Sequence, residues 1–475
     1  MHVFWVVLAS WVCLTVASFS GRVTPRPRAF AFLSTLILLT SIWAYLRLPL
    51  WQYWILLFAG LSVLVSIRFS GVGRKILSGL SLVLLVFASV CGYLFPLYVP
   101  QPMTGPHPVG YFVYYHDLSN LEMLAEAKLD QRVVPIKVWF PAKDKGEEQV
   151  SFDEAWVGLK ARWWFVPVLP DLMENLSLSK TAATNADVAI EGSLPVVIYN
   201  HGGGYYPEDN HVLLENIASH GYVVISVGHP QISSSIRYPD GSTQLADYEA
   251  YGRTALSIEE QVRLNEDYDR ALVASSYEEY FGLIEEYVMA PDPSEYRLQD
   301  RVANTIATVD MLEDLPIVGP RLDNESIVFM GYSFGGATSI EVCYRYPEKC
   351  SALINIDGLP AKSDGIMTAD LATTMLLLSG ESVPGAQKAY TSGQFVAENN
   401  SGISYNIQIA GATHRQFTSE GFYSPLFNID HGERQYYQTQ ASVERLILAF
   451  LGKHVLEVAE SDLPSSGPQL VVNPG

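Results

Sequence analysis

A serine stands between glycines in the segment Ile327 to Ser339, which reads IVFMGYSFGGATS. Gly331 to Gly335 fit the pattern G-x-S-x-G, in which a tight strand-to-helix turn raises the serine oxygen above the edge of a sheet. The glycines serve the backbone, because they remove Cβ atoms where the chain turns sharply. The pattern predicts that Ser333 is a nucleophile, but five residues also match by chance, so Ser333 needs partners elsewhere in the chain.

A serine hydroxyl is a weak nucleophile near neutral pH. A histidine must take its proton, and a carboxylate must hold that histidine in the correct tautomer. His414, in the segment IAGATHRQF, follows the last expected strand of the sheet. A histidine at that place is expected to be the base, and the alternative is a surface histidine in a turn.

Two carboxylates could orient His414, because each directly follows an expected strand. Asp357 ends LINID, the strand after the helix that begins near Ser333, and Glu381 ends LLLSGE, the next strand. Asp357 could also be only the aspartate of an Asp-Gly turn. Position alone does not choose between the two acids.

Ester or amide chemistry on serine also needs two backbone N–H groups that face the oxygen on which negative charge develops. Phe334, which follows the serine, supplies one of them, and Gly203 in the glycine-rich segment NHGGGYY is expected to supply the other. Three glycines could instead hold a phosphate, but no G-x-x-x-x-G-K-[ST] pattern is present. His201 and His229 are expected to be structural.

The elements that must position these groups belong to the α/β class. Apolar strands of five to eight residues alternate with helices from about residue 130 onward, which indicates a mostly parallel sheet covered on both faces. The expected strands are VPIKVWFPA, PVVIYN, YVVISV, IVFMGY, SALINID, TTMLLLSG and ISYNIQIAG. The domain is predicted to cover 111–456, preceded by a linker at 99–110 and followed by a disordered tail at 457–475.

The first hundred residues have a different composition. They contain no Asp or Glu and seven basic residues, and they predict a four-helix membrane region over 1–98. The four expected spans are Val3–Phe19, Ala29–Leu46, Leu48–Ile67 and Ile76–Leu97. These stretches lack Asp, Glu, Lys and Arg, so we expect them to anchor the protein and not to take part in its chemistry.

The basic residues predict the orientation of the spans. They gather in GRVTPRPR, between the first two spans, and in RFSGVGRK, between the last two, so both loops should be cytoplasmic. Everything after the fourth span should then lie on the extracytoplasmic side. The chain has 30 basic and 50 acidic residues, so this part holds 23 basic and all 50 acidic residues, which argues against nucleic acid as a partner.

Three further expectations concern the acidic part. The stretch at about 240–295 reads as an acidic helical insertion, either an ordinary packed segment or a lid over the site. Cys343 and Cys350 could form a disulfide, which their spacing leaves open. No spacing of His, Cys or carboxylates suggests a metal site, and no cofactor is expected.

A series of segments resembles the platelet-activating factor acetylhydrolase branch of the α/β-hydrolases. In chain order they are VPIKVWFPA, LPVVIYNHGGG, GYVVISVGHPQISSS, GYSFGGAT, INIDG and THRQF. The resemblance covers roughly residues 130–455 and implies that Asp357, not Glu381, is the acid of a Ser-His-Asp triad. It also implies an oxyanion hole made by Phe334 and the glycine-rich loop at His201 to Gly204 (the HG loop). This chain departs from the family at Tyr332, where a histidine is usual, and at Gly358, where an aromatic segment is expected.

Together these patterns predict a membrane-anchored hydrolase of carboxylic esters, with short-chain acyl esters or lipid-derived esters as substrates. The alternative is a non-catalytic membrane receptor or binding protein that uses a hydrolase-like domain. An intact set of serine, acid and histidine favours the enzyme, because a binding protein has no physical need to keep all three. The oligomeric state cannot be read from the sequence.

Overall fold

The computed structural model describes most of the chain. The described residues are 2–20, 27–119, 132–144, 148–151, 157–159, 171–178, 180–184, 186–246, 294–359, 369–381, 384–429, 432–458, 463–465 and 467–472, with single residues at 263, 266, 270, 279 and 283. The chain divides into two compact units. The first comprises Met1–Val99, Asp171–Ser179 and Phe422–Phe427, and the second comprises the remainder.

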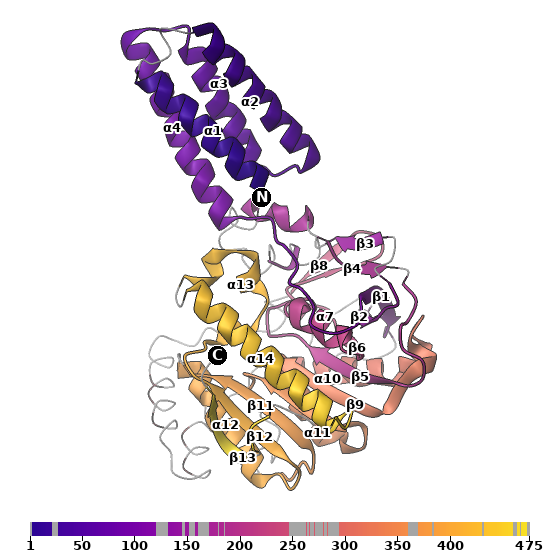
Figure 1. Cartoon of the computed structure of the whole chain (residues 1–475). Helices are drawn as coiled ribbons and strands as arrows, with labels where there is room; N and C mark the ends of the chain where they lie inside the picture. The colour runs from indigo at the N-terminus through magenta and orange to yellow at the C-terminus, as the bar shows by residue number, and fades with distance from the viewer. Residues whose placement is uncertain are drawn as a thin grey trace. The chain divides into compact units, whose positions relative to one another are not determined.

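Four helices form the body of the first unit (Figure 1). They are α1 (His2–Phe19), α2 (Pro27–Arg47), α3 (Gln52–Ser66) and α4 (Gly71–Leu94). Three stretches, His2–Phe19, Arg28–Arg47 and Gly71–Leu94, are long and apolar enough to cross a membrane. These three helices coincide with three of the four predicted spans.

The remaining span, predicted over Leu48–Ile67, is shorter than expected. Helix α3 has 15 residues and begins only at Gln52, so at about 1.5 Å per residue it is shorter than the roughly 30 Å hydrocarbon layer. Pro49 explains the late start, because a proline disfavours helical geometry in the residue before it and cannot donate a backbone hydrogen bond.

Hydroxyl groups connect the helices inside the bundle. The Oγ atoms of Ser18 and Ser66 lie 2.8 Å apart, and Ser78 donates to Ser18 over 2.9 Å. Thr15 and Ser81 are 3.1 Å apart in the same way. Small hydroxyl residues let apolar helices pack closely and hydrogen-bond to one another where water is absent.

The first unit also contains two segments that are distant in the sequence. Asn175 donates its side-chain N–H to Gln52 Oε1 over 2.9 Å and to the carbonyl of Phe95 over 3.1 Å. Ser424 donates to the carbonyl of Leu94 over 2.5 Å, and the indole of Trp51 donates to the carbonyl of Leu172 over 2.9 Å. Nothing in the sequence pattern indicated these partners.

Eleven of the described strands form one sheet, which is the centre of the second unit (Figure 1). Its order is β13-β12-β11-β10-β9-β5-β6-β2-β1-β4-β3, and the pairs from β13 to β6 are all parallel. The strands are β1 (Val109–Asp117), β2 (Val133–Pro141), β3 (Glu148–Ser151), β4 (Lys180–Thr184), β5 (Leu194–Asn200), β6 (Val223–Val227), β9 (Leu322–Tyr332), β10 (Ala352–Ile356), β11 (Thr374–Gly380), β12 (Ser404–Ile409) and β13 (Gly467–Val472). Strands β7 (Ser235–Arg237) and β8 (Thr243–Leu245) form a separate antiparallel pair.

Helices cover both faces of this sheet, so its central strands are buried on both sides. Side chains of α10 (Ser294–Asp310), α11 (Phe334–Arg345) and α12 (Pro384–Asn399) pack on one face, and those of α7 (His211–Ser219) and α14 (Glu433–His454) pack on the other. Two-sided burial explains the continuous apolar runs of these strands. The observed architecture agrees with the predicted α/β class.

Two predictions outside the core have different outcomes. The tail at 457–475 was expected to be disordered, but Gly467–Val472 form β13, which pairs in parallel with β12. The apolar run LVV suits a strand that extends an open sheet edge. The expected helical insertion lies almost entirely outside the described residues. Of its described part, 243–245 form the short strand β8, and the single residues 263, 266, 270, 279 and 283 are helical.

The structure joins Cys343 and Cys350 in a disulfide, with Cα atoms 5.2 Å apart. Cys343 lies near the end of α11, and Cys350 lies just before β10. The bond therefore closes the connection between the helix after the serine turn and the next strand of the sheet. A cross-link stabilises a fold mainly by reducing the freedom of the unfolded chain.

We expect the double variant Cys343→Ala, Cys350→Ala to lose about 2 kcal/mol of unfolding free energy, the entropy scale for so short a closed loop. Urea unfolding of the protein in detergent, followed by intrinsic fluorescence, measures this loss. The free Cys13 provides a matched control, because Cys13→Ala should leave the midpoint unchanged. Equal midpoints for the double variant and the unaltered protein would contradict the prediction.

Candidate active site

The serine turn has the strained backbone that G-x-S-x-G predicts. Ser333 lies between the end of β9 and the start of α11 with φ 53° and ψ −120°, a conformation that residues other than glycine rarely adopt. A Cβ on Gly331 would lie 2.1 Å from the carbonyl oxygen of Gly335, and a Cβ on Gly335 would lie 1.9 Å from that of Asn200. Both positions therefore require glycine.

The structure brings Ser333, His414 and Asp357 into one hydrogen-bonded chain. Nε2 of His414 lies 3.0 Å from Oγ of Ser333, and Nδ1 of His414 lies 2.5 Å from Oδ2 of Asp357. The Asp357 side chain is fully buried, whereas 37% of the His414 side chain is exposed. This arrangement orients the imidazole so that Nδ1–H faces the carboxylate and Nε2 faces the serine oxygen.

The sheet explains why these three residues meet. Ser333 follows β9, Asp357 follows the neighbouring strand β10, and His414 begins a short 3-10 helix soon after β12. All three strands run parallel, so their carboxyl ends lie at the same edge. Residues 24 and 57 positions apart in the sequence can therefore converge there.

The geometry distinguishes the two candidate acids. The second oxygen of Asp357 accepts the backbone N–H of Gly380 over 2.9 Å, so both carboxylate oxygens have donors. Glu381 is exposed, and its Oε2 accepts the backbone N–H of Gly411 over 2.7 Å. Glu381 thus hydrogen-bonds to the loop before the histidine, whereas Asp357 contacts the imidazole itself.

Tyr332 supports the histidine in a way that the sequence did not indicate. Its ring stacks on the His414 ring with centroids 5.0 Å apart and an interplanar angle of 29°. Its hydroxyl donates to the backbone carbonyl of His414 over 2.9 Å. In the sequence, Tyr332 is notable only because it replaces a histidine that is usual in the family. Its position next to Ser333 was the only sequence feature that could have suggested a role in the site.

Gly203 and Phe334 also come together. A Cβ on Gly203 would lie 3.3 Å from Cβ of Phe334, so the two backbones are adjacent. Among the acceptors that the structure describes, none receives a hydrogen bond from either N–H. Two neighbouring free N–H groups beside Ser333 have the composition of an oxyanion hole.

A buried carboxyl holds the loop that carries Gly203. Asp209 accepts the backbone N–H of Gly202 over 3.0 Å at one oxygen and the hydroxyl of Tyr199 over 2.6 Å at the other. Burial, which disfavours the charged form, raises the pKa of Asp209 to about 7, although these two hydrogen bonds act in the opposite direction.

The two histidines expected to be structural are fully buried. His201 contacts the Ser233 hydroxyl over 2.8 Å, and His229 contacts Oδ1 of Asn200 over 3.1 Å. Burial lowers the pKa of both imidazoles well below its usual value, and the nearby Arg301 guanidinium lowers it further. Both rings are therefore neutral near pH 7, and they brace the base of the HG loop.

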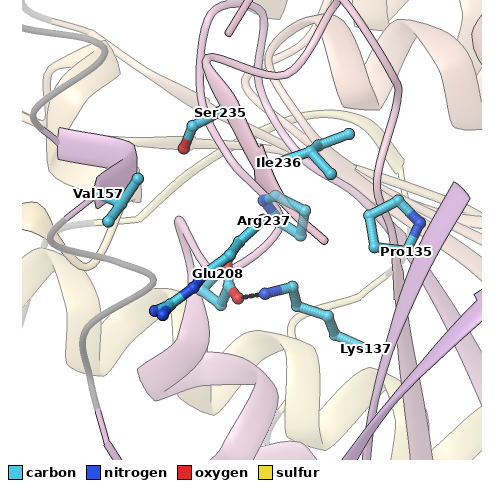
Figure 2. Close-up of a pocket in the computed structure, with 8 residues that line it drawn as sticks. Pro135, Lys137, Val157, Glu208, Ser235, Ile236 and Arg237 are labelled. Atoms are coloured by element: carbon cyan, nitrogen blue, oxygen red, sulfur yellow. Dashed lines mark hydrogen bonds and ion pairs between the residues drawn. The ribbon is translucent and has the colours of Figure 1, made fainter. Parts of the chain in front are cut away.

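A small cavity is lined in part by Glu208, which follows the same loop in the chain (Figure 2). Lys137 of β2 and Glu208, which both line it, form a buried ion pair. Ser226 of β6 donates to the carbonyl of Pro207, another lining residue, over 2.7 Å. The lining residues are Pro135, Lys137, Val157, Pro207, Glu208, Ser235, Ile236 and Arg237. Ser333, His414 and Asp357 are not among them.

The described ranges hold no group of three His, Cys, Asp or Glu side chains that could bind a metal ion.

The sequence model of the alpha/beta hydrolase fold matches residues 195–441, more than half of the chain, so this protein belongs to that family. The model of platelet-activating factor acetylhydrolase, isoform II, matches residues 97–272. The platelet-activating factor acetylhydrolase of Bos taurus is 25% identical over 216 residues, which cover 43% of this chain and 46% of that protein. The match thus spans less than half of the bovine relative.

A solved structure shows the same fold. The ferulic acid esterase from Streptomyces cinnamoneus superimposes with a TM-score of 0.54 at 17% sequence identity, and the match covers 77% of this chain and 96% of that one. At this level of identity the likeness concerns the fold of the hydrolase part.

We expect Asp357→Asn to reduce turnover on the order of 10⁴-fold, because an amide can stabilise the wrong imidazole tautomer. Glu381→Gln is the matched control, since glutamine can still accept the N–H of Gly411, and it should change turnover less than about tenfold. Steady-state kinetics on p-nitrophenyl acetate compares the two variants. If Glu381→Gln proves the more damaging change, the assignment of the acid is wrong.

Proposed function

We propose that this protein is a membrane-anchored serine hydrolase that cleaves carboxylic esters through an acyl-enzyme. The observation that carries the proposal is the continuous chain from Ser333 Oγ through His414 to the buried Asp357, beside two free N–H groups. Membership of the α/β-hydrolase family supports it. The similarity to an acetylhydrolase supports an ester as the substrate.

The first half of the reaction transfers the acyl group to the enzyme. His414 Nε2 takes the hydroxyl proton of Ser333 as Oγ attacks the ester carbonyl, and the carbonyl oxygen becomes negatively charged. The N–H groups of Gly203 and Phe334 stabilise that charge. His414 then gives its proton to the departing alcohol, while Asp357 stabilises the imidazolium formed in between.

The second half repeats these roles with water. His414 removes a proton from a water molecule that attacks the acyl carbon, and a second oxyanion forms at the same N–H groups. Ser333 leaves as His414 returns the proton to Oγ, which releases the carboxylic acid and restores the enzyme. The His414 side chain is 37% exposed, so water can reach the imidazole.

The similarity to platelet-activating factor acetylhydrolase favours short-chain acyl esters or lipid-derived esters as substrates. An apolar anchor supports the same choice, since a site tethered to a bilayer meets esters dissolved in that bilayer at a raised effective concentration. A binding protein without catalysis is the alternative function. It does not explain why a strained serine conformation is retained in line with a buried acid.

Active-site labelling tests the proposal. The full-length protein in detergent should gain one fluorophosphonate adduct on Ser333, measured by intact mass and peptide mapping, and should hydrolyse p-nitrophenyl acetate. Ser333→Ala should abolish both. Ser351→Ala, which alters an exposed serine whose hydroxyl donates to the carbonyl of Ile327, should abolish neither. A folded protein that neither labels nor hydrolyses the ester would favour the binding function.

The site is proposed to lie on the extracytoplasmic side of the membrane, with α1 to α4 all crossing it. The basic residues between α1 and α2 and at the start of α4 support this orientation. The disulfide supports it independently, because disulfides persist mainly in oxidising compartments. Although α3 is short, its buried residues pack together with those of the other helices in the core of the bundle.

Protease added to intact cells that express the protein should remove the residues after about position 100 and leave the helices. A cytoplasmic marker protein must stay intact in the same sample, as proof that the cells are sealed. A hydrolase part that resists digestion until the membrane is permeabilised would refute the orientation.

A further inference from the structure

Arg301, on α10, connects two segments that are far apart in the sequence. Its side chain is fully buried. Its Nη2 donates to the backbone carbonyl of His201, and its Nε donates to Oγ1 of Thr338 over 3.0 Å. His201 belongs to the HG loop, and Thr338 belongs to the helix that follows the serine.

Each of these segments carries one of the proposed oxyanion donors. His201 precedes Gly203 by two residues. Thr338 donates in turn to the carbonyl of Phe334 over 2.8 Å, and the Arg301 guanidinium lies 5.1 Å from the centroid of the Phe334 ring. Arg301 is thus joined by short contacts to both backbones that supply the N–H groups.

The charge of Arg301 is poorly compensated. Its hydrogen bonds end on neutral oxygens, its Nη1 is buried without a hydrogen-bond partner, and no carboxylate in the described ranges forms an ion pair with it. Arg132, the other buried arginine that contacts α10, is placed differently, because its Nη2 lies 3.8 Å from Oδ1 of Asp300. A buried cation without a counter-ion is costly to the fold.

The surroundings keep this charge in place near neutral pH. Burial lowers the pKa of Arg301 to about 9, and the neighbouring Asp209 and Tyr199 act in the opposite direction. The pKa of Asp209 is itself raised to about 7, mainly by burial and in part by the charge of Glu420. At that pH Asp209 is therefore only partly ionised, and it offsets only part of the positive charge of Arg301. The nearby imidazoles of His201 and His229 are neutral.

We infer that Arg301 is a positioning residue of the oxyanion hole, whose buried positive charge stabilises the negative oxygen of the tetrahedral intermediate and whose guanidinium holds the two N–H donors together. The charge is only partly compensated in the resting enzyme, and the oxyanion compensates it further when it forms. In a site of low dielectric constant such a charge acts over longer distances than it does in water. This inference rests on the proposed esterase function.

Three substitutions separate charge from packing. Arg301→Lys keeps the charge, Arg301→Gln keeps a hydrogen-bond donor without charge, and Arg301→Met keeps only an apolar chain. Arg132→Met is the matched control, because it removes a buried arginine that contacts the same helix but whose charge faces Asp300. The full-length proteins are compared in detergent on p-nitrophenyl acetate, and kcat is expressed per site titrated with a fluorophosphonate.

We expect Arg301→Gln and Arg301→Met to lower kcat per titrated site on the order of 10²-fold, the scale of one oxyanion donor, and Arg301→Lys to lower it about tenfold. KM should change little in all three. Affinity for a trifluoromethyl ketone, whose adduct with Ser333 carries an oxyanion, should fall in parallel with kcat. Arg132→Met should lower the unfolding midpoint and leave kcat per titrated site unchanged.

The comparison of lysine with glutamine decides the question even if the methionine variant does not fold. The inference is overturned if Arg301→Gln is as active per site as Arg301→Lys, or if all variants lose stability and keep kcat. It is also overturned if Arg132→Met lowers kcat per site as much as Arg301→Gln does. Failure of the unaltered protein to label overturns the proposed function itself, which is a distinct result.

Discussion

The close approach of Gly335 to the carbonyl of Asn200 is the constraint from which the rest of the site follows. A methyl group at this position could not fit, because it would lie 1.9 Å from that oxygen. The contact presses the start of α11 against the end of β5, and these are the two places where the chain leaves the sheet toward the site. Ser333 and the HG loop must therefore lie next to each other. His414 and Asp357 then have to reach only the place that Ser333 already occupies.

Much of this arrangement could be predicted from the sequence because it depends on local patterns. The glycines around Ser333, the apolar runs of β5, β9 and β10, and the place of His414 after β12 are each visible over a few residues. The parallel sheet then fixes which ends meet. The acid was harder to predict, since Asp357 and Glu381 both follow strands. Only the resemblance to the acetylhydrolases favoured Asp357. In the structure Asp357 contacts the imidazole, while Glu381 accepts the backbone N–H of Gly411.

Other features depend on long-range contacts that no short pattern reveals. Tyr332 stacks on a histidine 82 positions later in the chain, and Arg301 reaches a carbonyl 100 positions earlier. The strand at 467–472 was missed because its apolar run LVV is short and lies among Pro, Gly and Ser residues, and because its pairing with β12 is a long-range contact. The length of helix α3 was overestimated because the mean hydropathy of a long window is hardly changed by Pro49. The backbone, however, does not become helical again until after this proline.

The first compact unit has a consequence for how such a protein can be recombined. Its helices hold Asn175 and Ser424, which lie in segments far along the chain. The polypeptide therefore passes from one unit to the other several times along its length and not once. A chimera that exchanged only residues 1–99 for the helices of another protein would leave both side chains beside foreign partners. Modular exchange would need three matched segments, and the second and third would have to be chosen from the middle and the end of the chain.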